Sequence, residues 1–182
     1  MKVVYEYSHL GGKEILEVRF RKILHEIKEV IAEVKAERVK VSKEKTKYGS
    51  LLYAPGQMNH AFTKAFTRRG FKPFKHTYDI VLPGHKKPVV KRAYKEVDFV
   101  KRGVFVEVQF GKYTYMYYDL FKFQYFFNKG KAKVGVMIVP AHTLYLQMSS
   151  GVAYGEQLIY DLERLKRHFP AVPVYVVLID AD

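Results

Sequence analysis

Two uninterrupted apolar runs near the C-terminus constrain the fold of this 182-residue chain more than any other feature. Residues 133–139 read Lys-Val-Gly-Val-Met-Ile-Val and are followed by a proline, and residues 174–179 read Val-Tyr-Val-Val-Leu-Ile. A strand that is apolar on both faces must be covered on both faces, which is typical of a central strand with helices above and below the sheet. The two runs therefore predict the middle of a layered sheet.

Periodicity places the other elements around these strands. Apolar residues that recur at three- and four-residue steps predict helices over residues 13–35, 57–69, 114–128 and 154–169. Further short strands are predicted over residues 3–7, 51–54, 97–100 and 104–110. Residues 71–97 mix Pro, Gly, His and Lys with short apolar pieces and support no assignment. The order predicts an α/β fold with a mixed β-sheet flanked by helices on both faces, in a single domain over residues 1–182.

The charge of the chain indicates the class of its partner. Lysine and arginine total 32 against 18 acids, a formal charge of +14, and the basic residues are interspersed with Tyr, Phe and His rather than collected in a tail. A folded basic surface of this kind favours a polyanion, and nucleic acid first. No apolar stretch is long enough to span a membrane and no signal peptide is recognisable, so we expect a cytoplasmic protein with no membrane partner.

Several common kinds of catalytic site have no counterpart in the sequence. The chain has no cysteine, which excludes disulfides, thiolate zinc sites and cysteine nucleophiles. Its histidines lack zinc-ligand spacing, and neither a Gly-x-Ser-x-Gly elbow nor a Gly-x-x-x-x-Gly-Lys phosphate loop is present. Zinc-dependent, acyl-transfer and P-loop chemistry are therefore disfavoured.

The clearest candidate for a reactive site is a predicted hairpin. Residues 97–100 and 104–110 would pair across a tight turn at 101–103, which brings Asp98 beside Glu107. Because side chains alternate on a strand, Glu107 and Gln109 share one face while Val108 points into the opposite, apolar layer. Two carboxylates and a backbone carbonyl at a sheet edge form a plausible oxygen site for Mg²⁺.

Two other segments suggest binding rather than chemistry. Residues 40–48 are rich in lysine and hydroxyl groups, and Lys43, Lys45 and Lys47 would donate to phosphate oxygens; an ordinary exposed charged loop is the alternative. The helix predicted over 114–128 is apolar or aromatic nearly all round. Such a helix lies inside a domain or at a subunit interface, and its excess of aromatic residues favours a contribution to a homodimer.

The spacing of the hairpin residues also resembles a known signature. Asp98, eight residues, and then Glu107-Val108-Gln109 is similar to the Asp…(Asp/Glu)-x-Lys signature of the PD-(D/E)xK nucleases, with Gln109 in the place of lysine. Ordered matches at 7–10, 42–47, 98–101, 107–113, 118–121 and 148–151 make most of the chain resemble the BglII/BstYI group of restriction endonucleases.

This resemblance implies a restriction-endonuclease-like fold and a homodimeric type II enzyme that cuts double-stranded DNA with Mg²⁺. The implied site is a palindrome centred on GATC, with a purine and a pyrimidine outside it, cut to leave 5′ overhangs. Asp98, Glu107 and the carbonyl of Val108 would bind the metal, and Gln109 would lie near the attacking water.

The resemblance also implies where the DNA is read. Lys112 and Ser150 match positions that approach base edges in the major groove, and lysine and serine suit that role chemically. Ser149, next to Ser150, is also expected to bind DNA. A companion DNA methyltransferase that acts on the same site is a further expectation. The chain is shorter than the resembled enzymes between His76 and Asp98. A structure-selective repair or junction nuclease and a non-catalytic DNA-binding protein are the alternatives that the residues leave open.

Overall fold

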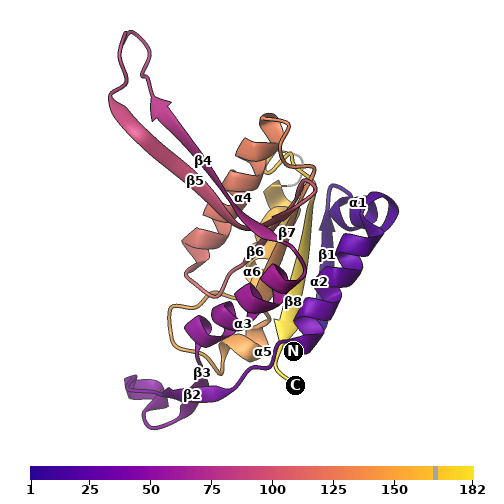
Figure 1. The fold of residues 1–182 in the computed structure, drawn as a ribbon. Helices are drawn as coiled ribbons and strands as arrows, with labels where there is room; N and C mark the ends of the chain where they lie inside the picture. Colours follow the sequence, from indigo (N-terminus) through magenta and orange to yellow (C-terminus); the bar gives the residue numbers. More distant parts are fainter. Residues whose placement is uncertain (166–167) are drawn as a thin grey trace.

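A six-stranded mixed sheet forms the centre of the molecule. The computed structural model describes residues 1–165 and 168–182. The strand order in this sheet is β1-β8-β7-β6-β5-β4 (Figure 1). Strands β6, β7 and β8 are parallel to one another, whereas β1, β5 and β4 join their neighbours antiparallel. The strands are β1 (Lys2–His9), β4 (Lys72–Ile80), β5 (Val90–Lys101), β6 (Val104–Val108), β7 (Val134–Pro140) and β8 (Val174–Asp180).

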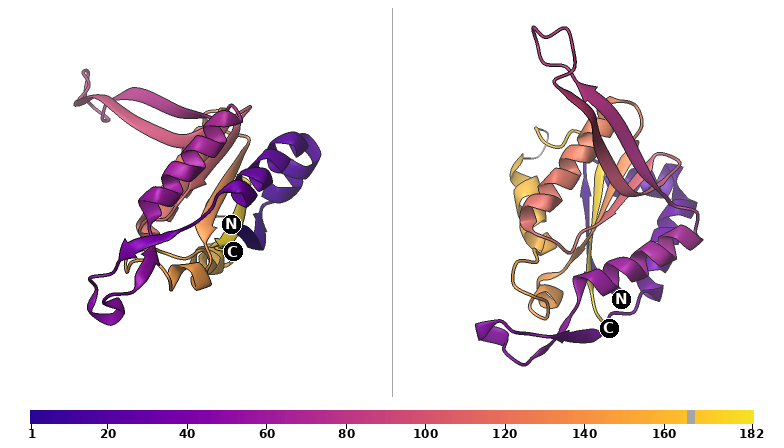
Figure 2. Two further views of the ribbon diagram at one scale, coloured as in Figure 1. Left: turned by 60° about the horizontal axis from the view of Figure 1, so that its bottom comes forward. Right: turned by 60° about the vertical axis from the view of Figure 1, so that its left-hand side comes forward.

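Helices cover both faces of this sheet, as the sequence predicted (Figure 2). Helices α1 (Gly12–Arg19), α2 (Arg21–Glu33) and α3 (Pro55–Arg68) pack on one face, while α4 (Tyr113–Asn128) and α6 (Gly155–Leu165) pack on the other. The short α5 (His142–Tyr145) follows β7 directly. None of the helices in the described ranges combines the length and hydropathy that crossing a bilayer requires.

The two apolar runs occupy the positions that their composition predicted. Every residue of β7 and the first six residues of β8 are buried. Along β8, Val174, Val176 and Leu178 face α4 and α6, whereas the alternate residues face the other helical layer. The sheet therefore separates two apolar cores, and a polar side chain in either core lies between the sheet and a helix.

The stretch that the sequence left unassigned forms most of a long antiparallel arm. Strands β4 and β5 pair over most of their length and project from the body of the molecule (Figure 1). Alternating exposed and half-buried residues along β4 show that the arm has little core of its own. A separate two-stranded sheet of β2 (Arg38–Val41) and β3 (Leu51–Tyr53) encloses the 3₁₀ turn η1 (Lys45–Lys47).

The helix predicted over 13–35 is wrong in one respect, because the chain bends at Phe20 and forms two helices. Phe20 has φ −134°, outside the helical range, although its N–H still donates to Leu16 and its carbonyl accepts from Leu24. Gly12 brings α1 directly against the backbone of β8, since a Cβ there would lie 2.3 Å from the Val174 carbonyl carbon. Because α1 packs this closely against β8, its axis runs in a different direction from the axis of α2. Of the helix predicted over 154–169, the structure describes α6 from Gly155 to Leu165. Residues 166–167 of that prediction lie outside the described residues.

Candidate active site

The predicted hairpin is present and its turn has a specific cause. Lys101 pairs with Val104, which leaves a two-residue loop of Arg102 and Gly103 with φ values of 52° and 85°. Positive φ at both positions matches the twist of a tight hairpin, and glycine makes the second position inexpensive. The ammonium of Lys101 donates to Glu26 at 2.7 Å and to the Arg69 carbonyl at 2.6 Å, so the turn is also fastened to helices α2 and α3.

The register of the hairpin places the two predicted acids opposite each other. Phe99 pairs with Val106, so one further step along both strands brings Asp98 to Glu107. On the other side of β5, the four residues from Val97 to Val100 face only three residues of β4, Lys72 to Phe74, which is a bulge. Bulges re-aim side chains at the point where pairing ends. Here the irregularity coincides with Asp98, at the place where β5 leaves the sheet to form the arm.

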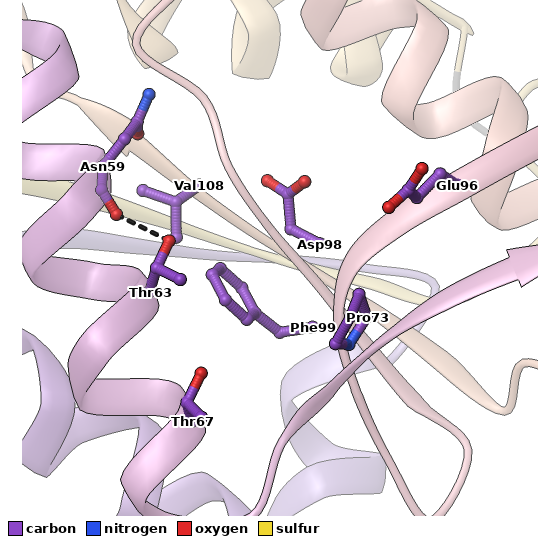
Figure 3. A pocket seen from close by; sticks show the side chains of 8 residues that line it. All are labelled: Asn59, Thr63, Thr67, Pro73, Glu96, Asp98, Phe99 and Val108. Carbon is purple, nitrogen blue, oxygen red and sulfur yellow. Dashed lines mark hydrogen bonds between the residues drawn. The ribbon is translucent and has the colours of Figure 1, made fainter.

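Asp98 opens into a cavity of about 350 Å³ between α3 and the strands. Figure 3 shows its carboxylate and that of Glu96 projecting from β5, with Val108 across the cavity. The remaining lining residues are Asn59, Thr63, Thr67, Pro73 and Phe99. Asp98 is exposed, in contrast to its neighbours Val97 and Phe99. The predicted residues Asp98 and Val108 therefore share one accessible site.

Glu107 precedes Val108 on β6 but does not line this cavity; it is buried, with only 2% of its surface exposed. Its carboxylate accepts a hydrogen bond from Nζ of Lys122, a residue of α4. Burial, followed by repulsion from Asp119 and Asp98, raises the pKa of Glu107 well above its ordinary value, and the ammonium of Lys122 opposes this rise. The contribution of Asp98 agrees with the hairpin register, which sets Asp98 opposite Glu107.

Gln109 is held by two hydrogen bonds. Its Nε2 donates to Oδ2 of Asp119 at 2.7 Å, and its Oε1 accepts from the backbone N–H of Gly111 at 2.9 Å. The backbone N–H of Gln109 donates to Ile138, which continues the pairing with β7 by one residue. The amide is thus fixed in orientation just beyond the end of β6.

Asp119 and Lys122 are site residues that the sequence reasoning missed. Lys122 Nζ pairs with Oδ1 of Asp119 at 2.9 Å, and both side chains are buried between α4 and the sheet. An acid and a lysine three positions apart lie on the same face of a helix. On a helix that is otherwise mostly aromatic, this charged pair was the sequence signal that could have identified the two residues.

The oxygen atoms at this site are of the kind that a hard cation prefers. Carboxylates of Asp98 and Glu107 and the carbonyl of Val108 suit Mg²⁺. Among residues 1–165 and 168–182, no group of three or more His, Cys, Asp or Glu side chains could hold a metal ion. The residues fit a site made from two carboxylates and other oxygens, and do not form an all-side-chain cage.

Five of the six predicted DNA-contacting residues, all except Lys112, fall into two segments that touch each other. Lys40 Nζ donates to Oγ of Ser149 at 2.5 Å, and Lys47 Nζ donates to the Met148 carbonyl at 2.8 Å. The backbone N–H of Ser150 is bonded to both carboxylate oxygens of Glu44, at 2.9 and 3.1 Å. The lysine-rich segment and the serine loop, 100 residues apart in sequence, are therefore held together. Lys43, Lys45 and Ser150 are exposed.

One backbone contact connects this cluster to the end of β6. The N–H of Ala153 donates to the carbonyl of Gly111 at 2.9 Å. Gly111 lies between Gln109 and the exposed Lys112. The serine loop is thus attached within two residues of Gln109, which brings the predicted cutting and reading residues to adjoining parts of the molecule.

Comparison with known proteins gives consistent matches. The family model described as restriction endonuclease BglII/BglIII matches residues 4–179. The crystal structure of the restriction endonuclease BglII complexed with a DNA 16-mer is similar, with a TM-score of 0.76 and 24% identity over 100% of this chain and 78% of that one. Free BglII gives a TM-score of 0.68 and 20% identity over 100% of this chain and 81% of that one. No curated protein matches the chain.

Proposed function

The chain belongs to the BglII/BglIII family of restriction endonucleases, and we propose that it is a Mg²⁺-dependent homodimer that cuts double-stranded DNA at a palindrome centred on GATC. As a member of this family it is a type II site-specific deoxyribonuclease with the restriction endonuclease fold. The Mg²⁺ requirement, the DNA sequence, the dimer and the catalytic and DNA-binding residues are proposed here. Residues 1–182 are proposed to form one endonuclease domain.

The hairpin register that sets Asp98 opposite Glu107, next to a cavity lined by Asp98 and Val108, is the observation that carries the catalytic proposal. In this proposal, these three residues hold Mg²⁺ through their side-chain and carbonyl oxygens. Bound there, Mg²⁺ would offset charge on the scissile phosphate and lower the pKa of a water molecule. The carboxylates supply the negative charge that retains the cation, and the cavity between α3 and the strands gives the phosphate access.

Gln109 has a limited but definite role in this scheme. An amide neither accepts a proton at neutral pH nor carries charge, so Gln109 acts as a hydrogen-bond partner of the nucleophilic water. The contacts with Asp119 and Gly111 hold it for that purpose before DNA arrives. Preorganised polar groups of this kind contribute to catalysis because they need not reorient during the reaction.

DNA recognition is assigned to the exposed cluster next to this site. Lys112, Ser149 and Ser150 approach the base edges, and Lys43, Lys45 and Lys47 contact phosphates. The specificity is a sequence of the form RGATCY, cut to leave 5′ overhangs. Within a cytoplasm, such an enzyme would act beside a companion methyltransferase that protects the same sites.

The dimer is assigned to helix α4. Tyr115, Tyr118 and Phe121 recur at three-residue steps, and each exposes about half of its surface. A row of exposed aromatic side chains is typical of a protein interface. Two-fold symmetry of the dimer would then match the two-fold symmetry of the palindrome.

Digestion of plasmid DNA with purified protein tests the function. With Mg²⁺, discrete fragments should appear, and sequencing of their ends should map every cut to GATC-centred sites with 5′ overhangs. Chelation of the metal with EDTA should abolish cutting, and Asp98→Asn should serve as the inactive control. Cuts at unrelated sequences would refute the GATC assignment. Full activity in EDTA would refute the requirement for a metal ion.

A further inference from the structure

Lys122 is the one buried lysine among residues 1–165 and 168–182, and it lies in the candidate active site. Its ammonium meets the carboxylate of Glu107, Oδ1 of Asp119 at 2.9 Å and the carbonyl of Glu96 at 2.9 Å. An ammonium has three N–H donors, so these three contacts use all of them. The side chain is only 7% exposed and points inward from α4.

Acidic side chains outnumber basic ones around Lys122. Glu107, Asp119 and Asp98 act on one another electrostatically, whereas Lys122 is the only cation within hydrogen-bond reach of Glu107 and Asp119 among the described residues. A buried charge is costly unless it is paired, so removing one partner leaves the other uncompensated. The ammonium therefore holds two buried acids at once, and each of them depends on this single cation.

The geometry points to Lys122 as an internal counter-ion that holds Glu107 in the metal-free protein and releases it when a divalent cation binds. This inference rests on the proposed function, in which Glu107 is a metal ligand. Asp119, three residues earlier on the same helix, keeps the ammonium after the exchange. Competition from Lys122 weakens metal binding by the free enzyme, and a DNA phosphate at the site restores it by adding further oxygen ligands.

Lys122 also offers an explanation for the glutamine at position 109. The resembled nuclease signature has a lysine at that place, on the strand, whereas here a lysine reaches the same acid from α4. A cation that reaches Glu107 from a helix and bonds directly to its carboxylate competes with the metal ion for that carboxylate. Lys122 is accordingly a positioning residue, and its effect should appear in metal affinity.

Calorimetric titration of the DNA-free protein with Mg²⁺, and separately with Ca²⁺, tests this inference. Lys122→Met removes the charge and keeps an unbranched side chain of similar volume, and it should bind both cations at least about tenfold more tightly than the wild type, a difference of about 1.4 kcal/mol. Lys95→Met is the matched control. Lys95 is also on the α4 side of β5, but its Nζ donates to the Tyr78 hydroxyl and lies over aromatic rings. The affinity of Lys95→Met for both cations should equal that of the wild type.

Unchanged or weaker binding by Lys122→Met would overturn the inference, and so would the absence of binding in both that variant and the wild type. A crystal structure of the wild type with Ca²⁺ and without DNA gives a second test that does not depend on a variant that folds. Lys122 should contact Asp119 and no longer Glu107; a metal on Glu107 with Lys122 still bonded to it would refute the exchange. Failure of the wild type to cut DNA with Mg²⁺ would instead refute the proposed function.

Discussion

Gln109 donates a hydrogen bond from Nε2 to Oδ2 of Asp119 over 2.7 Å, which joins the end of β6 to helix α4. At the other end of the same amide, the N–H of Gly111 donates to Oε1 at 2.9 Å. Because an ionised carboxylate only accepts hydrogen bonds, Asp119 determines which end of the amide faces the helix. The glutamine therefore has one preferred orientation, and residues that disturb it should affect cleavage before they affect folding.

Gly111→Ala should reduce cleavage by about a hundredfold, since a displacement of about 1 Å at a reacting group has effects of that size. The added Cβ would lie 2.6 Å from Oε1 of Gln109 and 3.0 Å from the Tyr115 ring, so the amide must turn. Gly56→Ala is the control, because no atom lies within 4 Å of its added Cβ. Single-turnover cleavage rates, measured with DNA binding and thermal unfolding, check this. A wild-type rate in Gly111→Ala would show that the orientation of Gln109 is unimportant.

Asp98→Asn and Glu107→Gln should each reduce cleavage at least about a thousandfold and leave DNA affinity largely intact. The expected size follows from the several kcal/mol of charge stabilisation that a catalytic metal provides, at about 1.4 kcal/mol per tenfold. Rates and equilibrium binding to the same duplex would be measured side by side. Glu26→Gln, which alters a carboxylate that bonds to Lys101 at the hairpin turn and does not line the cavity, is a matched control. Normal turnover in either active-site variant would remove that residue from the mechanism.

Lys45→Ala and Lys112→Ala should weaken binding in different ways. A phosphate contact is independent of sequence, so the loss of Lys45 should lower affinity for all DNA and reduce the slope of log affinity against log salt by about 1. A base contact carries specificity, so the loss of Lys112 should cost about 1–3 kcal/mol on the cognate site and little on unrelated DNA. Binding isotherms at several salt concentrations distinguish the two. The reverse pattern would exchange the roles assigned to these lysines.

Phe121→Glu should weaken the dimer and convert double-strand cleavage into nicking of one strand. Phe121 is 45% exposed on α4, and burying a carboxylate there against an apolar partner is costly. Val18→Glu is a control of the same kind, because Val18 is 82% exposed on α1, on the opposite face of the sheet. Sedimentation equilibrium measures the association, and supercoiled plasmid distinguishes nicks from double-strand cuts. An unchanged dimer would place the interface elsewhere.

The elements with strong local signals were predicted correctly from the sequence. Strands β7 and β8 have unbroken apolar runs, and the turn at Arg102 and Gly103 lies between two short apolar pieces, so composition and periodicity were sufficient. The β4–β5 arm gave no such signal because its residues are mostly exposed and pair with each other. The bend at Phe20 was missed for a related reason, since the apolar periodicity continues through it and no Gly or Pro marks it.

Prediction of the candidate site was limited in the same way, because local sequence does not reveal contacts between distant segments. Asp98, Glu107 and Gln109 could be selected because they lie close together along one hairpin. Asp119 and Lys122 reach the same place only because α4 packs across β6, and that contact depends on tertiary structure. Likewise, the contact between Ser150 and Glu44 spans 106 residues. Local sequence can suggest residue types for such contacts, but it cannot show which side chains meet.

Glu6 should make stability depend on pH in acid solution. Partial burial opposes its ionisation, but hydrogen bonds from Tyr175, Lys28 and Lys13 outweigh this and lower its pKa from 4.5 to about 2. Because the folded pKa lies below the unfolded one, the stabilisation is complete above about pH 5 and is lost as the pH falls towards 2. It amounts to about 2 kcal/mol after allowance for partial exposure. Urea unfolding of Glu6→Gln should show a correspondingly smaller loss over this range, and the more exposed Glu17→Gln should match the wild type. Identical pH profiles for Glu6→Gln and wild type would contradict the assignment.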